Sequence, residues 1–170
     1  MPAIQELFVR RMEEKDIPHA CAIDIASSAL PWSEHSLRFE LNQNPAARLW
    51  VAEMADEMGE ARVVGLLVLW IIVDEVHIAN IAVHPDFRRR RIGQRLLAKG
   101  LLSASEEGAR SVFLEVRRGN LAAQSLYRRF GFIETGIRPR YYRDNREDAV
   151  LMSLESLQPD LLHKWEQDTL

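Results

Sequence analysis

Hydrophobic positions change from strand-like to helix-like spacing between residues 76 and 102. Residues 76–83 form a mostly apolar run, VHIANIAV, which predicts a buried strand. A turn with Pro85 follows, and apolar side chains then recur at helical spacing, at Ile92, Leu96, Leu97, Leu101 and Leu102. The pattern therefore predicts a strand, a short loop and a helix, in that order.

The loop between that strand and helix is strongly basic. It carries Arg88, Arg89, Arg90 and Arg91, and the helix then begins with Ile92, Gly93 and Gln94. Backbone N–H groups at a helix start lack intrahelical partners, and the helix dipole adds positive charge there. Together with guanidinium groups, these N–H groups predict a phosphate or pyrophosphate site. A solvated basic turn would show the same arginine run, so the run alone does not decide.

The same two periodicities place the remaining elements. Strands are predicted over residues 7–12, 48–54, 62–73, 111–117, 132–138 and 148–154. Helices are predicted from a cap at Asp16 to about Ser28, from a cap at Ser33, and from a cap at Asn120 to Phe130, with Gly131 as a left-handed terminator. Seven strands and four helices in this order predict a mixed sheet with helices on both faces, in one domain over residues 1–154. Residues 155–170 are predicted to be a tail, in which Leu161, Leu162 and Trp165 form one or two helical turns.

Composition narrows the classes of protein. A chain of 170 residues with 47% apolar residues can build the core of one domain. The net charge of −3 gives no support for nucleic-acid binding, and the single Cys21 excludes an internal disulfide. The N-terminus has no apolar signal core, and the run 63–73 is too short for a membrane span. We expect a soluble cytoplasmic protein, a monomer or weak homodimer, that binds neither membrane nor nucleic acid. The five histidines lack metal-ligand spacing, so no metal is predicted.

The basic loop also matches a motif. Arg88 to Gly93 resembles the acetyl-CoA signature of the GNAT N-acetyltransferases, R/Q-x-x-G-x-G/A, with Arg88 in the first position and Gly93 in the last. Arg91 stands where the middle glycine is found. A Cβ restricts φ and keeps a ligand farther from the backbone, so a closer cofactor contact is expected at Gly93 than at Arg91.

A second block extends the resemblance. Residues 114–132, LEVRRGNLAAQSLYRRFGF, are similar to the L-E-V-R-x-x-N-x-x-A-x-x-L-Y-x-x-x-G-F stretch of bacterial ribosomal-protein-alanine N-acetyltransferases. The segments PWSE at 31–34, YY at 141–142 and REDA at 146–149 also resemble that branch of the family. The resemblance covers residues 7–154. It implies an α/β (α+β) fold with a mostly antiparallel seven-stranded sheet and splayed central parallel strands, and acetyl-CoA as cosubstrate.

The resemblance also implies roles for individual residues. Glu115 is the candidate base that deprotonates the amine, and Tyr127 the candidate acid for the departing thiolate. Each has a plain structural alternative, a strand hydrogen bond for Glu115 and helix packing for Tyr127. Cofactor contacts are expected from Ile81, Ala82, Val83, Arg88, Arg89, Arg90, Arg91, Ile92, Gly93, Gln94, Asn120 and Tyr127. A strand splayed after Ala82 would free backbone groups for the pantetheine amides. No serine or cysteine lies in a nucleophile turn, which favours direct transfer.

The acceptor is expected to be a protein N-terminus, with the N-terminal alanine of a small-subunit ribosomal protein implied by the resemblance. Trp32, Tyr141 and Tyr142 are expected to border it, and Glu34 and Asp144 to attract a basic residue that follows. Deprotonating an α-amine at pH 7 costs about 1.4 kcal/mol, against about 4.6 kcal/mol for lysine, so a single carboxylate favours the α-amine. A small-molecule amine acetyltransferase and a non-catalytic acetyl-CoA-binding module stay open as alternatives.

Overall fold

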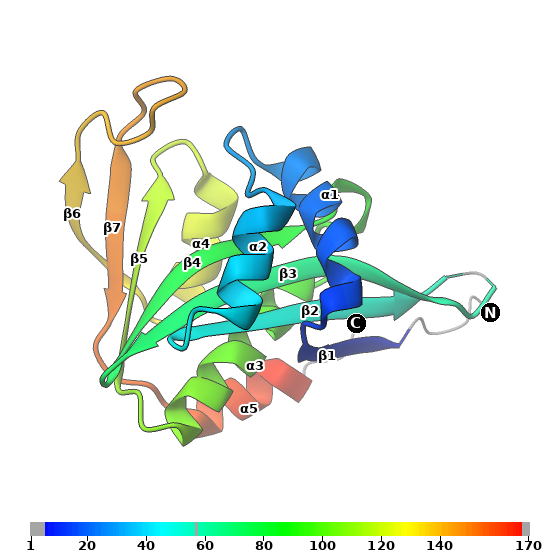
Figure 1. Cartoon of the computed structure of the whole chain (residues 1–170). Coiled ribbons are helices and arrows are strands. Elements are labelled where there is room, and N and C mark those ends of the chain that lie inside the picture. The colour runs from blue at the N-terminus through cyan, green and yellow to red at the C-terminus, as the bar shows by residue number, and fades with distance from the viewer. Residues whose placement is uncertain (1–5, 57, 168–170) are drawn as a thin grey trace.

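The computed structural model describes residues 6–56 and 58–167, which form one seven-stranded sheet with helices on both faces (Figure 1). The strands are β1 (Leu7–Arg11), β2 (Ala47–Ala55), β3 (Ala61–Ile72), β4 (Glu75–Val83), β5 (Ser111–Arg117), β6 (Ile133–Arg138) and β7 (Ala149–Leu154). The helices are α1 (Ile17–Ser27), α2 (Glu34–Asn42), α3 (Ile92–Glu106), α4 (Leu121–Arg129) and α5 (Pro159–Gln167). Two short 3-10 helices precede α1 and α3, at Glu14–Asp16 and Pro85–Phe87.

The strands are ordered β1-β2-β3-β4-β5-β7-β6, and neighbours are antiparallel except for the parallel pair β4 and β5. This confirms the predicted mixed, mostly antiparallel sheet. The parallel strands pair at three positions, of which the last is His77 with Phe113, and then diverge. The divergence therefore starts well before Ala82, the point expected from sequence. Just after this point, β4 has one extra residue between Ile78 and Asn80, the partners of Leu69 and Val68 in β3. Such a bulge bends a strand.

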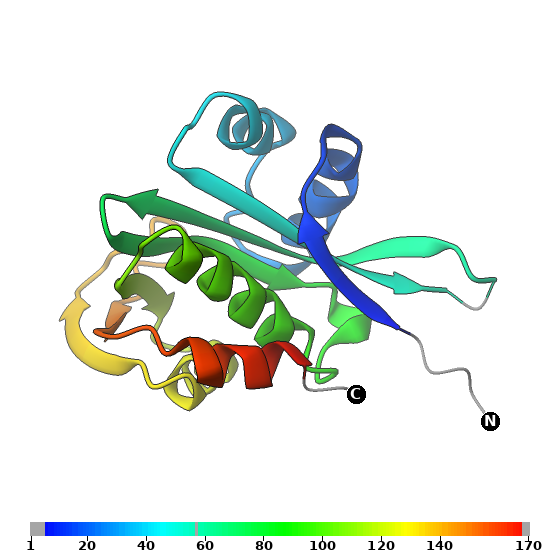
Figure 2. The same ribbon diagram turned by 90° about the horizontal axis from the view of Figure 1, so that it is seen from below.

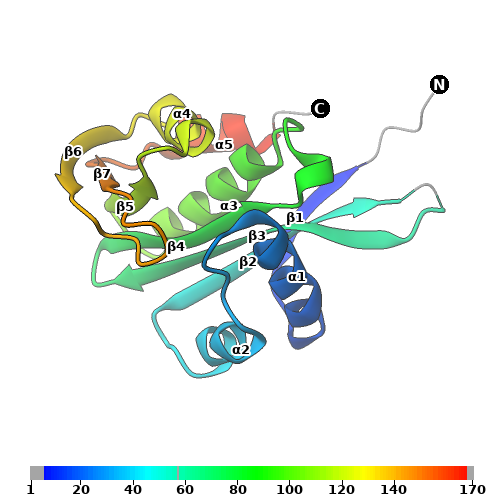
Figure 3. The same cartoon turned by 90° about the horizontal axis from the view of Figure 1, so that it is seen from above.

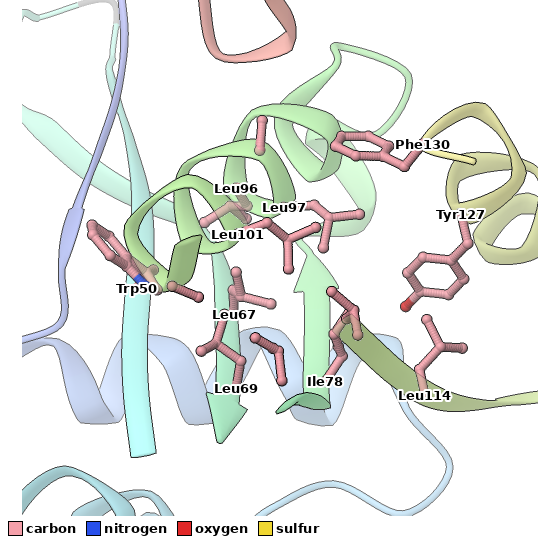
Figure 4. Close-up of a cluster of buried hydrophobic side chains, with 14 of the residues drawn as sticks. Trp50, Leu67, Leu69, Ile78, Leu96, Leu97, Leu101, Leu114, Tyr127 and Phe130 are labelled. Carbon is pink, nitrogen blue, oxygen red and sulfur yellow. The ribbon is translucent and has the colours of Figure 1, made fainter. Parts of the chain in front are cut away.

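Helices α1 and α2 cover one face of the sheet, and α3, α4 and α5 lie on the other (Figure 3). On the second face, the fully buried Leu96, Leu97 and Leu101 of α3 pack against Leu67 and Leu69 of β3 (Figure 4). On the first face, α1 and α2 complete a separate cluster with the other side of β2 and β3. Apolar side chains on both faces of the central strands explain why residues 62–73 form a continuous hydrophobic run.

Two of the three predicted helix caps are confirmed. The Ser33 hydroxyl accepts a hydrogen bond from the Ser36 N–H (3.0 Å), and the Asn120 side chain accepts one from the Ala123 N–H (3.1 Å). Asp16 occupies the predicted N-cap position of α1, but its side chain makes no cap hydrogen bond. Its buried carboxylate instead accepts hydrogen bonds from the Glu13 N–H and from the Arg10 guanidinium, both at 2.7 Å. The tertiary ion pair outcompetes the cap, because a buried carboxylate needs a charged partner.

The segment predicted as a tail forms helix α5, which is longer than the one or two turns expected. Leu162 is buried in the main core, and Trp165 stacks on Phe130 with ring centroids 5.8 Å apart. The Arg95 Nε donates to the Glu166 carbonyl (3.0 Å), so α5 lies along α3 (Figure 2). It therefore packs on the face of the sheet opposite α1 and α2. None of the described helices is both long and apolar enough to cross a membrane.

Candidate active site

A cavity of about 400 Å³ lies where β4 and β5 diverge. Its lining comes from the end of α1, from β4, from β5 and the start of α4, and from the loop between β6 and β7. The lining residues used below are Asp24, Ser27, Asn80, Ile81, Ala82, Glu115, Arg117, Asn120, Tyr127, Tyr142, Asp144 and Glu147. Divergence of two parallel strands thus opens a pocket within an otherwise continuous sheet.

The end of β4 presents backbone groups to this cavity. The His84 N–H donates to the Val64 carbonyl (2.8 Å), and Ala82 pairs with Leu66, so these residues direct their backbone groups toward β3. Backbone groups alternate along a strand, so those of Ile81 and Val83 point toward the diverging side. The Val83 carbonyl there accepts a hydrogen bond from the Ser27 hydroxyl (3.2 Å). Ile81 and Val83 thus have the predicted orientation, whereas Ala82 uses its backbone groups within the sheet.

Glu115 lies on the wall of the cavity. In β5, Val112, Leu114 and Val116 are buried, and the alternate residues, including Glu115, face the other way, as the predicted alternation requires. The Glu115 carboxylate lies 3.4 Å from the Arg138 guanidinium of β6, with about a third of its side chain exposed. It is thus reachable from solvent and from the cavity, as a base that meets an incoming amine must be.

Tyr127 lines the same cavity from the opposite face of the sheet. Its side chain extends from α4, and its hydroxyl points toward the space between Leu114 of β5 and Ile78 of β4 (Figure 4). The residue is 4% exposed, and burial raises the pKa of the phenol above its usual value. The hydroxyl therefore stays protonated at neutral pH. Glu115 and Tyr127, twelve positions apart in sequence, are brought to one cavity by the β5–α4 connection.

The basic loop adopts a left-handed backbone conformation at Arg91, the position of the middle glycine in the acetyl-CoA signature. Arg91 occupies the position before α3 with φ 57°, in the left-handed region, and Arg89 has φ 60°. A residue other than glycine costs about 1 kcal/mol or more in this region, so the arginine takes the glycine conformation at a cost. Arg88 to Arg91 are exposed.

The first intrahelical bond of α3 runs from the Arg95 N–H to the Arg91 carbonyl (3.0 Å), so the amides of Ile92 and Gly93 precede the helical ladder. A Cβ built on Gly93 would meet Leu126 and Val83 at 3.6 and 3.8 Å, which is ordinary contact. A methyl group therefore fits at this position. Amides at a helix start, flanked by exposed guanidinium groups, fit a pyrophosphate.

The residues predicted to contact the acceptor divide into two groups. Tyr142 lines the cavity, and burial raises its pKa to about 12. Tyr141 stacks edge-on against it (5.1 Å between ring centroids) but is not among the lining residues. Trp32 also lies off the cavity lining and packs on the α1–α2 side of the core.

The carboxylates predicted to attract a basic residue are already paired. Glu34 lies 3.7 Å from Arg38, outside the cavity lining, and Asp144 lies 2.9 Å from Arg117. Arg117 also holds the pKa of Asp144 below its usual value. Each carboxylate thus has a cationic partner within the protein, and Asp144 shares its partner with Glu147.

Asp24 is a cavity residue that sequence reasoning missed. It is 1% exposed, and its carboxylate accepts hydrogen bonds from the Trp32 N–H (2.7 Å) and the Asn80 side-chain amide (3.0 Å). It thereby ties the loop after α1 to the irregular part of β4. The available signal was a single acidic residue within the otherwise apolar stretch of a predicted helix.

Comparison with known proteins identifies the family. A profile described as the acetyltransferase (GNAT) family matches residues 10–132. The chain belongs to this family. It is 38% identical over 144 residues to a putative ribosomal protein bS18-alanine N-acetyltransferase of Bacillus subtilis, covering 85% of this chain and 92% of that protein. It is 32% identical over 157 residues to the ribosomal protein bS18-alanine N-acetyltransferase of Escherichia coli K12, covering 86% and 95%.

A crystal structure of the ribosomal-protein-S18-alanine N-acetyltransferase from Escherichia coli superposes with a TM-score of 0.77 at 31% identity, covering 90% of this chain and 96% of that chain. The predicted family and fold are therefore confirmed, and the family uses acetyl-CoA. Within residues 6–56 and 58–167, no group of three His, Cys, Asp or Glu is arranged to hold a metal ion.

Proposed function

We propose that this GNAT acetyltransferase transfers the acetyl group of acetyl-CoA directly to the N-terminal amine of a protein. By analogy with the relatives named above, the acceptor is the N-terminal alanine of a ribosomal protein, met in the cytoplasm. The observation that carries the proposal is the cavity itself. A carboxylate, Glu115, and a buried phenol, Tyr127, line one pocket beside the edge of β4 that diverges from β5.

The residues fit the cosubstrate along a continuous path. Arg88 to Arg91 and the first amides of α3 would hold the pyrophosphate, and the backbone of Ile81 and Val83 would pair with the pantetheine amides. Asn120 lines the cavity and caps α4, so its amide group can serve both the helix and the pantetheine. When bound, acetyl-CoA supplies an acetyl group activated as a thioester.

The chain's own groups would then move two protons. Glu115 takes the proton of the acceptor ammonium, directly or through a water, and the Val83 N–H polarises the acetyl carbonyl. The acceptor nitrogen would attack the acetyl carbon, and the C–S bond would break as the C–N bond forms. The Tyr127 hydroxyl, which burial keeps protonated, would give its proton to the departing sulfur, and the second proton lost by the nitrogen would return to the Tyr127 oxygen through water. The cost of about 1.4 kcal/mol for an α-amine at pH 7 is within the reach of one carboxylate.

Charge in the cavity supports a cationic acceptor. Four lining side chains are carboxylates, from Asp24, Glu115, Asp144 and Glu147. Two guanidinium groups pair with them, that of Arg117 from the lining and that of Arg138 from outside it. A surplus of two negative charges remains, which favours entry of an ammonium group over a neutral or anionic acceptor. A peptide N-terminus and a polyamine are both cationic and both suit this charge, so an assay must distinguish between these two acceptors.

The experiment incubates the protein with acetyl-CoA and short peptides that differ at their first two residues. Spermidine and an N-terminally blocked, lysine-containing peptide serve as competing acceptors, and mass spectrometry locates the product. We expect acetylation of the first nitrogen of peptides that begin with alanine. Acetylation of spermidine without peptide product would support the small-amine alternative, and acetyl-CoA binding without any product would support a non-catalytic module.

A further inference from the structure

Arg117, at the end of β5, has an unusually rich set of partners in the loop between β6 and β7 (residues 139–148, here called the acceptor loop). Its guanidinium lies 2.9 Å from the Asp144 carboxylate and 3.3 Å from that of Glu147, and donates to the Asn145 side-chain carbonyl (3.3 Å). The guanidinium carbon also lies 3.9 Å from the ring centroid of Tyr142. One side chain thus contacts four residues of the acceptor loop.

The acceptor loop is folded on itself and is attached to the rest of the protein at this point. Within the loop, the Tyr142 N–H donates to the Glu147 carbonyl (3.2 Å) and the Arg146 N–H to the Tyr142 carbonyl (2.9 Å). The Glu147 carboxylate also accepts a hydrogen bond from the Gly119 N–H (2.7 Å). The Arg118 N–H also donates to the Asp148 carbonyl (3.0 Å). Internal hydrogen bonds thus hold the loop together, and residues 117–119 attach it to the end of β5 and the turn that follows.

The same turn of chain faces both reactants of the proposed reaction. Asn120, proposed to contact the pantetheine, follows Gly119 directly, and Tyr142, proposed to face the acceptor, lies under the Arg117 guanidinium. A Cβ on Gly119 would lie 2.8 Å from the Glu147 carboxylate, so the turn and the loop are in close contact. The position of the acceptor loop thus depends on contacts with the turn that carries Asn120, the residue proposed to bind the pantetheine.

We infer that Arg117 is a positioning residue, which holds the acceptor loop so that Tyr142 forms the cavity wall on the acceptor side. The inference rests on the proposed function for its kinetic consequence, whereas the position of the loop can be tested separately. Each ion pair is partly exposed and by itself worth little. A planar guanidinium that bridges two carboxylates and stacks on a ring acts as a network, which lysine cannot reproduce.

The test compares Arg117→Met with Arg117→Lys and with a matched control, Arg48→Met. Arg48 also makes an ion pair at similar exposure, with Glu107 at 2.7 Å, and lies outside the cavity lining. Measurements are hydrogen–deuterium exchange of residues 139–148, the Kd of acetyl-CoA, and kcat and KM for an alanine-initiated peptide. Should Arg117→Met fail to fold, Glu147→Gln removes a partner from the other side and is tested in the same way.

We expect faster exchange of the acceptor loop in Arg117→Met, a peptide KM raised roughly 10-fold (about 1.4 kcal/mol of binding) and an unchanged Kd for acetyl-CoA. Arg117→Lys should not restore KM, and Arg48→Met should alter neither exchange nor KM. Unchanged loop exchange, or faster exchange with an unchanged KM, would overturn the inference. If the parent protein acetylates no peptide, the proposed function fails, while faster exchange in Arg117→Met still supports the positioning role.

Discussion

Two glycines of α3 differ in the space around them, so substitutions at the two positions can separate cofactor binding from core packing. Gly93 and Gly100 are seven positions apart, so they lie on nearly the same side of the helix. A Cβ on Gly100 would lie 2.5 Å from Leu67 Cδ2 and 2.9 Å from Leu69 Cδ2, both fully buried. A Cβ on Gly93 would make contacts of 3.6 Å or more. The packing of the core thus leaves no room for a methyl group at Gly100, whereas a methyl group fits at Gly93.

These contacts set the expected stabilities. Gly100→Ala forces a methyl group into the core at a cost of about 1–3 kcal/mol. The better helix propensity of alanine offsets up to about 1 kcal/mol of this, which leaves a net loss of roughly 1–2 kcal/mol. Gly93→Ala meets no clash and should leave the free energy of unfolding unchanged or raise it by up to about 1 kcal/mol.

The expected effects on cofactor binding differ between the two positions. The acetyl-CoA signature accepts glycine or alanine at the Gly93 position, so Gly93→Ala should bind acetyl-CoA with nearly the parent affinity. If the pyrophosphate lies over the first amides of α3, the carboxylate of Gly93→Asp repels it. A loss equivalent to one charge-assisted hydrogen bond, about 1.5–3 kcal/mol, then weakens acetyl-CoA binding roughly 10- to 100-fold. Gly100→Ala should bind with the parent affinity, because its methyl group faces the core.

Urea unfolding followed by circular dichroism measures stability, and isothermal titration calorimetry measures the Kd of acetyl-CoA for the parent and the three variants. Gly93→Asp should lose affinity without losing stability, because a carboxylate in the first turn of a helix interacts favourably with the helix dipole. Gly100→Ala should lose stability without losing affinity. Parent-like acetyl-CoA affinity in Gly93→Asp would refute the placement of the pyrophosphate at the start of α3.

Substitutions at three further residues test the proposed chemistry. Glu115→Gln should lower kcat by about 10²- to 10⁴-fold with little change in the Kd of acetyl-CoA, and equal turnover would refute the base assignment. Tyr127→Phe keeps the buried ring, so the melting temperature should change little while kcat falls at least about 10-fold; an unchanged kcat would leave Tyr127 a packing residue only. Asn120→Ala should cost about 0.5–2 kcal/mol of stability, because the cap to Ala123 is lost. Asn120→Ser should restore the cap but not the pantetheine contact, so stability without recovered acetyl-CoA affinity supports both roles.

Local patterns were sufficient for most of the secondary structure. Alternation and helical spacing placed every strand to within about two residues, and Ser33 and Asn120 cap their helices as predicted. Gly131 has φ 94°, the left-handed conformation expected after α4. These features depend on residues a few positions apart, so the sequence contains them directly.

Predictions were wrong or incomplete where a distant partner decides the local structure. Asp16 does not cap α1, because its carboxylate pairs with Arg10 on β1. Residues 155–170 were expected to be a tail with one or two helical turns. A helix of nine residues has little stability in isolation, and α5 forms because it packs against α3. The divergence between β4 and β5 begins after His77, next to an irregular residue of β4, and periodicity reveals neither feature.

The sequence by itself determined the family, the order of the elements and the residues of the two motifs, since these are properties of neighbouring positions. Only the tertiary structure placed Glu115, Tyr127 and Ile81 around one cavity, and showed Arg117 bound to a loop some thirty residues away. The physical reason is that a site between diverging strands is made by contacts among segments that meet only after the sheet has formed. Such contacts leave no spacing pattern along the chain.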